Sequence, residues 1–256
     1  MEHEEKRPIY PDVTVTALKD SVKFVEIRDD DGKNYYGGDQ EWYKEKVAQD
    51  GACGTVAAAN ITAYLAGNDI KKYSGLYNYP DFSKTNFLAH MYDLYKYLSP
   101  YYIPFKNFPL GIWPMSKFIR GVEKFARSRN VSLKGQGVEK LAVCRSALHN
   151  SVNEDSKFSR NNIADFIKNG LIRNSPVAML IGFNNNLKNI EVQQPNGYSF
   201  VQRSFATHWV TVTEIKEDKI NDKITVKVST WGGYSYFDLD DYINGETVYI
   251  CLVYFN

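Results

Sequence analysis

The chain has 256 residues, 43% of them hydrophobic, and its 31 Lys and Arg against 30 Asp and Glu give a formal net charge of +1. This length and apolar content suffice for a sizeable core, which excludes a largely disordered chain. The near-balance of charge provides no general attraction for polyanions, so we expect no nucleic-acid partner. The three cysteines form no CxxC pair, which argues against a disulfide framework and a thiolate zinc site. We therefore expect no metal and no other cofactor.

The first twenty residues, "MEHEEKRPIYPDVTVTALKD", are acidic and then polar, whereas a signal peptide needs a basic patch followed by an apolar run. No stretch approaches the ~20 apolar residues that span a bilayer, which predicts no membrane span. The default expectation is a cytoplasmic protein. Secretion is the alternative, because a chain that has lost its signal peptide would look the same.

Residues 1–46 contain short strand-like pieces, "VTVTAL" and "VKFVEI", interrupted by the turn "DDDGKN" and by Gly37–Gly38. We predict a lead-in over residues 1–34 and a single domain over 35–256. Apolar spacing at the period of a helix then follows in several segments, with Ser83 as a cap and Gly170 as a stop. The predicted helices cover 55–65, 83–98, 115–130, 137–152 and 159–171.

After Pro176 the sequence changes to β-branched and aromatic runs separated by polar turns, among them "VAMLIGF", "HWVTVTEI", "KITVKVSTW" and "TVYICLVYF". These runs predict an antiparallel sheet. A helical N-terminal half followed by a C-terminal sheet is an α+β plan, and no internal repeat interrupts it.

A lone cysteine stands between two glycines in "VAQDGACGTVAAANITA", where the chain turns into an alanine-rich helix. Cys53 can simply fill a gap in the packing. Alternatively, Gly51 and Gly54 let the backbone approach a substrate, and the helix N-terminus lowers the pKa of the thiol so that a thiolate forms near neutral pH. Cys144, in a helical pattern, and Cys251, in an apolar strand, are expected to be unreactive.

A catalytic cysteine needs a base to accept its proton. His3 lies in the charged N-terminus, while His90 and His149 fall inside amphipathic helices, where a histidine is usually structural. His208 differs because it opens the strand "HWVTVTEI", from which a rigid scaffold can direct an imidazole across a cleft. We therefore pair His208 with Cys53.

The next strand ends in "KVSTWGGYSYFDLDDY". A cysteine at a helix start, a histidine on a strand and then a Trp-Gly motif follow the chain order of papain-like cysteine peptidases, and the Cys-to-His separation is close to the ~130–150 residues of that group. The chain thus resembles the papain-like cysteine peptidase superfamily, and "ACGTVAAANITAYLA" is similar to the helix start of bacteriocin-processing peptidases. The resemblance implies a papain-like fold, with the nucleophile at a helix N-terminus packed against the antiparallel sheet.

The resemblance makes Cys53 the nucleophile and His208 the general base that later protonates the leaving amine. Papain-like enzymes carry Asn or Asp before the Ser-Trp-Gly, where this chain has Ser229. A serine hydroxyl can accept a hydrogen bond from imidazole Nδ1 but lacks a carboxylate's charge. If Ser229 does not orient the imidazole, Asp238 and Asp240 are the next candidates.

The family also supplies a glutamine side chain to the oxyanion hole. Gln40 and Gln49 both qualify, and Gln40 is preferred because Gln49 lies too close to Cys53 in sequence to reach the far side of the thiol. Trp231 is expected to shield the histidine from water. The predicted substrate-binding residues are Gly51, Gly54, Trp209 and Trp231.

The leading functional expectation is a thiol hydrolase that cleaves peptide or amide bonds through an acyl-enzyme, with a peptide or protein as its substrate. An acyltransferase of the transglutaminase type would use the same Cys-His pair. A third hypothesis is a weakly catalytic papain-like module that binds peptides without cleaving them, and Ser229 at the position of the usual Asn is the feature that supports it.

Overall fold

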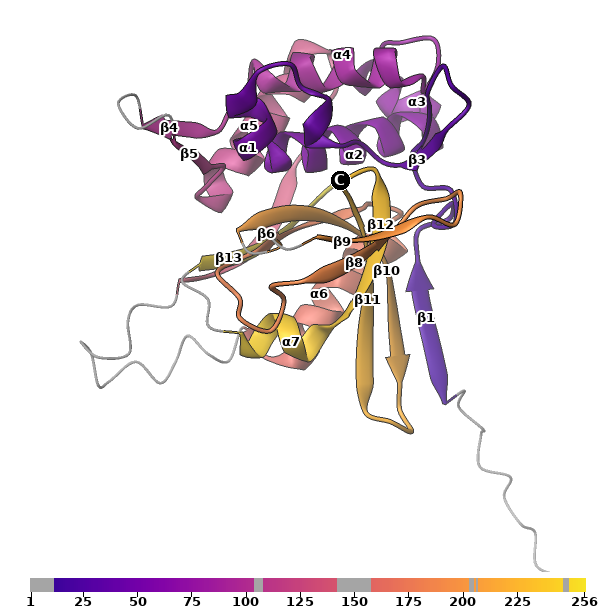
Figure 1. Cartoon of the computed structure of the whole chain (residues 1–256), viewed down its shortest axis with the longest axis vertical. Helices are drawn as coiled ribbons and strands as arrows, with labels where there is room; N and C mark the ends of the chain where they lie inside the picture. Colours follow the sequence, from indigo (N-terminus) through magenta and orange to yellow (C-terminus); the bar gives the residue numbers. More distant parts are fainter. Residues whose placement is uncertain (1–11, 104–107, 142–157, 203–204, 206, 246–248) are drawn as a thin grey trace, which may run out of the picture.

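The computed structural model describes residues 12–103, 108–141, 158–202, 205, 207–245 and 249–256. Cys144, His149 and His3 lie outside these residues. The fold combines helices with an antiparallel sheet, as the α+β prediction requires (Figure 1). The helices are α1 (Lys46–Gly51), α2 (Cys53–Asn68), α3 (Ile70–Tyr73), α4 (Lys84–Tyr95), α5 (Met115–Ser128), α6 (Arg160–Ile172) and α7 (Leu239–Asn244), with short 3-10 turns η1 (Gln40–Trp42) and η2 (Ser74–Leu76).

Over the described residues the main sheet has nine strands, and every pair in it is antiparallel. Its order is β6-β13-β7-β10-β11-β12-β8-β9, and β1 pairs with the far end of β10. The strands are β1 (Val13–Ala17), β6 (Gly135–Leu141), β7 (Val177–Ile181), β8 (Ile190–Gln193), β9 (Ser199–Gln202), β10 (His208–Asp218), β11 (Lys223–Thr230), β12 (Gly233–Asp238) and β13 (Tyr249–Phe255). Two small hairpins accompany it, β2 (Glu26–Arg28) with β3 (Asn34–Tyr36) and β4 (Tyr101–Ile103) with β5 (Phe108–Gly111).

Helices cover both faces of the sheet (Figure 1). Neighbouring residues of a strand point to opposite faces, and β10 shows this directly. Thr211 contacts Asn60 of α2, whereas Val212 pairs with Val177, which packs against Gly170 of α6. The core therefore has two layers, with α1 to α5 on one side of the sheet and α6 and α7 on the other.

Most predicted elements are confirmed. Serine side chains cap α4 and α6. Ser83 accepts a hydrogen bond from the backbone N–H of Asn86, and Ser159 accepts one from that of Asn162. α6 does not end at Gly170, as predicted, but continues to Ile172. The glycine lies inside the helix, at a place where the sheet packs closely against it.

The helix predicted over residues 137–152 is wrong for the part of it that the structure describes. Residues 137–141 belong to strand β6, which pairs with β13 over its whole length, and the remainder of the predicted segment 137–152 lies outside the described residues. The apolar spacing of "GVEKL" fits a helix as well as a strand, and the free edge of β13 decides between them by offering backbone hydrogen bonds.

The predicted boundary at residue 34 does not separate two parts of the structure. β1 is a strand of the main sheet, and the β2–β3 hairpin crosses the boundary. Residues 12–34 are therefore built into the fold, and the core they share is continuous.

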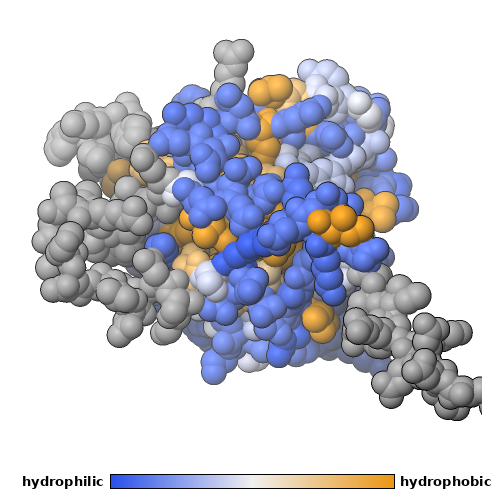
Figure 2. All heavy atoms as spheres, turned by 90° about the horizontal axis from the view of Figure 1, so that it is seen from below, coloured by the Kyte–Doolittle hydropathy of each residue, from blue (hydrophilic) through white to orange (hydrophobic). Residues whose placement is uncertain are grey.

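Two surface properties bear on partners. Within the described part of the chain, no helix combines the length and apolar character needed to cross a bilayer. The face shown in Figure 2 is mainly polar, with apolar side chains in small separate patches.

Candidate active site

Cys53 is the first residue of α2, as predicted. The chain leaves α1 through Ala52, whose backbone (φ −94°, ψ 19°) breaks the helix, and no side chain caps the N-terminus of α2. The first backbone N–H groups of a helix have no partner within it. Because every residue from Cys53 to Ala66 is buried, the helix holds the thiol rigidly against the sheet.

His208 begins β10, and its ring contacts two residues at the end of β11. Imidazole Nε2 lies 2.8 Å from the Thr230 hydroxyl, and the ring stacks on Trp231 with centroids 3.9 Å apart and planes 1° from parallel. Trp231 and Gly232 both have positive φ and form the two-residue turn between β11 and β12, a geometry that glycine favours. This turn places the indole over the imidazole and shields one face of it.

The thiol and the imidazole line one cavity. Its volume is about 10 Å³, room for about one water molecule. Polar atoms from the helix, from the two strands and from the segment before η1 converge there. The lining residues are Gly38, Gln40, Cys53, Val56, Ala57, Asn60, His208, Trp209, Thr211, Ser229, Thr230 and Trp231.

Burial keeps both reactive groups neutral at rest. It raises the pKa of the Cys53 thiol above its ordinary value, and backbone hydrogen bonds from Trp209, Gly54 and Cys53 itself oppose this without offsetting it. Burial lowers the pKa of His208 to about 3. The contacts of these side chains within the described residues include no hydrogen bond between them. The expectation of a thiolate near neutral pH is therefore wrong for this resting state, because desolvation outweighs the helix N-terminus.

Gln40 and Gln49 are separated clearly by the structure. Gln40 lies in η1, which Asp39 caps by accepting the N–H of Glu41. The Oε1 of Gln40 is buried at the cavity and has no hydrogen-bond partner among the described residues. Gln49 instead donates to the backbone carbonyls of Tyr43 (2.7 Å) and Glu41 (3.4 Å). Gln40 is thus the glutamine at the cavity, and Gln49 stabilises residues 41–43, which follow Gln40.

Ser229 lines the cavity but does not contact the imidazole. Its hydroxyl donates to the carbonyl of Tyr36 (2.8 Å) and accepts from Asn60 Nδ2 (3.4 Å). The predicted bond from Ser229 to Nδ1 is replaced by one between Thr230 and Nε2, because alternate residues of β11 face different sides. The hydroxyl that contacts the ring therefore meets Nε2 and not Nδ1.

The fallback carboxylates have other partners. Asp238 caps α7 by accepting the N–H of Asp240 (2.9 Å), and the Asp240 carboxylate lies 3.1 Å from Arg160 Nε. Both stabilise the α6–α7 side of the sheet.

The predicted substrate-binding residues divide into two groups. Trp209 and Trp231 line the cavity and are only 3% and 7% exposed. Gly51 and Gly54 are buried and do not line it. A Cβ at Gly54 would lie 3.0 Å from both Ile112 and Trp209, so this glycine allows the helix to pack against the sheet and does not face a substrate.

Sequence reasoning missed Thr230 and Asn60. Thr230 was adjacent to the residue chosen, and only the register of β11 shows which hydroxyl meets the imidazole. Asn60 could have been found from the sequence. It is an amide in an alanine-rich helix, two turns after Cys53 and on the same face.

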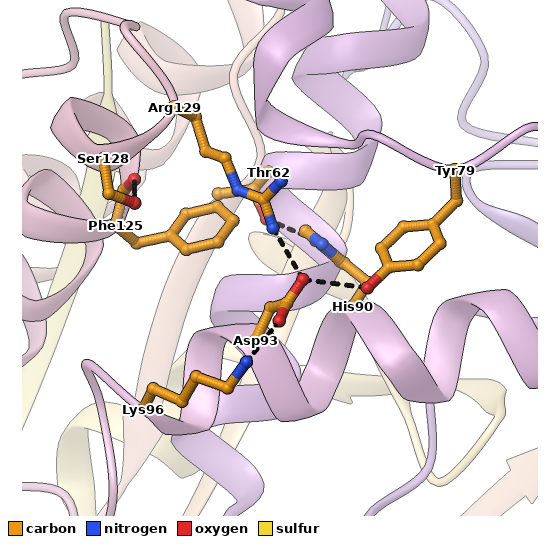
Figure 3. Close-up of polar contacts among 8 residues, drawn as sticks. All are labelled: Thr62, Tyr79, His90, Asp93, Lys96, Phe125, Ser128 and Arg129. Atoms are coloured by element: carbon orange, nitrogen blue, oxygen red, sulfur yellow. Dashed lines mark hydrogen bonds and ion pairs between the residues drawn. The ribbon is translucent and has the colours of Figure 1, made fainter.

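His90 and Cys251 are structural, as expected. His90 is fully buried beside Thr62 (2.9 Å), and burial lowers its pKa to about 3. Figure 3 shows it next to Asp93, which binds Arg129 (2.6 Å) and joins α4 to α5. A hollow of about 280 Å³ lies over this network. Cys251 is buried in β13.

No group of three or more histidine, cysteine or acidic side chains is placed to hold a metal ion in the part of the chain that is described. No protein-family model matches the sequence, and a search of curated proteins finds no match.

Proposed function

We propose that this protein is a cysteine hydrolase of the papain-like type that cleaves peptide or amide bonds. The observation that carries the proposal is the shared cavity, in which Cys53 at an uncapped helix N-terminus faces the same space as His208, whose ring Thr230 and Trp231 hold in place. A nucleophile, a base and a group that orients the base are the parts that covalent catalysis requires.

The reaction would run in two halves. Cys53 Sγ attacks the substrate carbonyl while its proton passes to Nδ1 of His208, and the resulting imidazolium protonates the leaving amine as the C–N bond breaks. Water then attacks the thioester, gives a proton to His208 and releases the acid, and the proton returns to the thiolate sulfur.

The oxyanion would be held by the Cys53 backbone N–H and the Gln40 side-chain amide. Among the described residues no side chain caps the helix start, and the Gln40 side chain, whose Nε2 is a donor, lines the cavity. Donors fixed in advance stabilise the developing charge in a site that excludes water. The Gln40 atom without a partner among the described residues is Oε1, an acceptor, so a substrate N–H, and not its carbonyl, would supply the partner it lacks.

The resting site is nearly closed and electrically neutral. A peptide therefore has to displace the side chains around the cavity before attack, and proton transfer accompanies attack because the separated thiolate and imidazolium are disfavoured by burial. A module that binds peptides without turnover is the competing function, and it is favoured by the absence of a hydrogen bond between Cys53 and His208 among the described residues. An acyltransferase would share every step up to the thioester and differ in using an amine in place of water.

The test combines a peptide library with labelling by iodoacetamide. We expect wild type to cleave a subset of peptides, Cys53→Ala to abolish turnover, and Cys251→Ala to leave it unchanged. Labelling should map to Cys53. Absence of cleavage by wild type under conditions where Cys53 is alkylated would reject the hydrolase, and product carrying an added amine would indicate acyl transfer.

A further inference from the structure

Asn60 is a buried amide at the junction of three elements that carry the proposed catalytic groups. It lies on α2, seven positions and about two turns after Cys53, so both side chains project from one face of the helix. Only 2% of its surface is exposed, and it lines the same cavity. Burying an amide is unfavourable unless its hydrogen bonds are made.

The side chain of Asn60 makes three hydrogen bonds. Oδ1 accepts from the backbone N–H of Gly38 at 2.8 Å. Nδ2 lies 3.4 Å from the hydroxyl of Ser229 and 3.5 Å from that of Thr211. The first bond is the short one, so the segment before η1 is held most firmly.

Each partner is close in sequence to a proposed catalytic group. Gly38 precedes Gln40 by two residues, and Thr211 follows His208 by three on β10. Ser229 is the neighbour of the threonine that contacts the imidazole. One amide therefore connects the helix of the nucleophile with the glutamine segment and with the two strands of the base.

Among the described residues, Asn60 is the α2 side chain that hydrogen-bonds to the segment before η1, residues 36–39. On its opposite side, backbone bonds join Gly232 N–H to the carbonyl of Gly38 (3.1 Å) and Tyr36 N–H to that of Gly232 (2.8 Å). The segment is thus held between the helix and the β11–β12 turn. Removal of Asn60 would release the helix side alone.

We propose that Asn60 is the positioning residue of this site, which sets the place of Gln40 relative to Cys53 and fixes the strand of His208. This inference rests on the proposed function for its catalytic meaning, whereas the placement of the segment is a property of the fold. Asn60 acts through its partners, so its loss should slow turnover more than it weakens substrate binding.

The matched variants are Asn60→Ala and Thr62→Val. Thr62 is on the same helix and equally buried, and its hydroxyl bonds to the carbonyl of Ala58 (2.8 Å) and to His90 away from the cavity. Both changes remove a buried polar group from α2. Only Asn60→Ala removes the hydrogen bonds to Gly38, Thr211 and Ser229.

Two measurements decide the proposal. In hydrogen exchange, we expect faster exchange over residues 36–43 in Asn60→Ala and wild-type exchange there in Thr62→Val. In turnover rate, expressed per Cys53 that can be alkylated, we expect Asn60→Ala to lose about tenfold in kcat, which is the effect of losing the short buried bond to Gly38. KM should change less than about twofold. Thr62→Val should keep the wild-type kcat per active site.

A double-mutant cycle distinguishes positioning from general destabilisation. Because Asn60 acts through the Gln40 segment as well as through the strand of His208, the loss in the double variant Asn60→Ala with Gln40→Ala should be smaller than the sum of the two single losses. Additive losses, or unchanged exchange over 36–43, would overturn the inference. If wild type shows no turnover, the proposed function fails, and hydrogen exchange still tests the inference. Faster exchange in Asn60→Ala confined to residues 36–43 supports the placement of this segment by Asn60, and exchange equal to wild type rejects it.

Discussion

Thr230, and not its neighbour Ser229, brings its hydroxyl to the imidazole of His208. We predict that Thr230→Val, which keeps the shape and removes the hydroxyl, lowers kcat/KM by about tenfold because one buried hydrogen bond is lost. Thr230→Ser should restore most of the rate. The ring resonances of His208, followed by NMR, should shift in Thr230→Val and stay in place in Ser229→Ala. Identical ring resonances in wild type and Thr230→Val would show that the hydroxyl does not orient the base.

Asp39 is a second single residue with a measurable effect. Burial raises its pKa to about 6, so the folded state binds a proton more tightly than the unfolded chain, and stability from this group decreases as pH rises from about 4 to 6. Asn caps as well as Asp. We predict that Asp39→Asn is more stable than wild type at pH 7, by up to about 2 kcal/mol, and that urea unfolding at pH 4 shows the difference greatly reduced. A pH-independent difference would contradict the assignment.

Among the elements, the segment from β3 to η1 packs closely against β11. Gly37 has φ +81°, and a Cβ there would lie 2.3 Å from the Ser229 hydroxyl, whereas Gly32, with φ +80°, has open space around it. We predict that Gly37→Ala lowers the free energy of unfolding by more than 2 kcal/mol, since it combines backbone strain with a clash, while Gly32→Ala costs only about 1 kcal/mol of strain. Urea unfolding of the pair measures the difference. Equal losses would mean that the segment does not pack against β11 as described.

For the whole molecule, two buried histidines predict instability in acid. Burial lowers the pKa of both His90 and His208 to about 3, so their contribution is present above the unfolded pKa of about 6.5 and is lost as pH falls through this range. We predict that His90→Gln removes about one proton from the uptake on unfolding. Between pH 6 and 4 its free energy of unfolding should therefore fall less steeply than that of wild type, by about 1.4 kcal/mol per pH unit. Parallel curves would show that His90 is protonated in the folded protein.

The sequence by itself determined the elements whose signals are local. The Ser83 cap and apolar periodicity located α4, apolar periodicity located α6, the alanine-rich run located α2, and β-branched runs located β7, β10 and β11. It also selected Cys53, His208 and Gln40, because a glycine-flanked cysteine, a histidine at a strand start and a glutamine after two glycines are visible without a fold. These three do line one cavity.

Tertiary structure alone decided what depends on register and burial. The edge of β13 made residues 135–141 a strand, and the alternation of β11 turned Thr230, not Ser229, to the imidazole. Burial reversed the expected pKa shift of the thiol. Asn60 became meaningful only when its partners, distant in the chain, were brought to the same amide. Local chemistry can be read along a chain, whereas desolvation and hydrogen-bond partners arise only when the chain is packed.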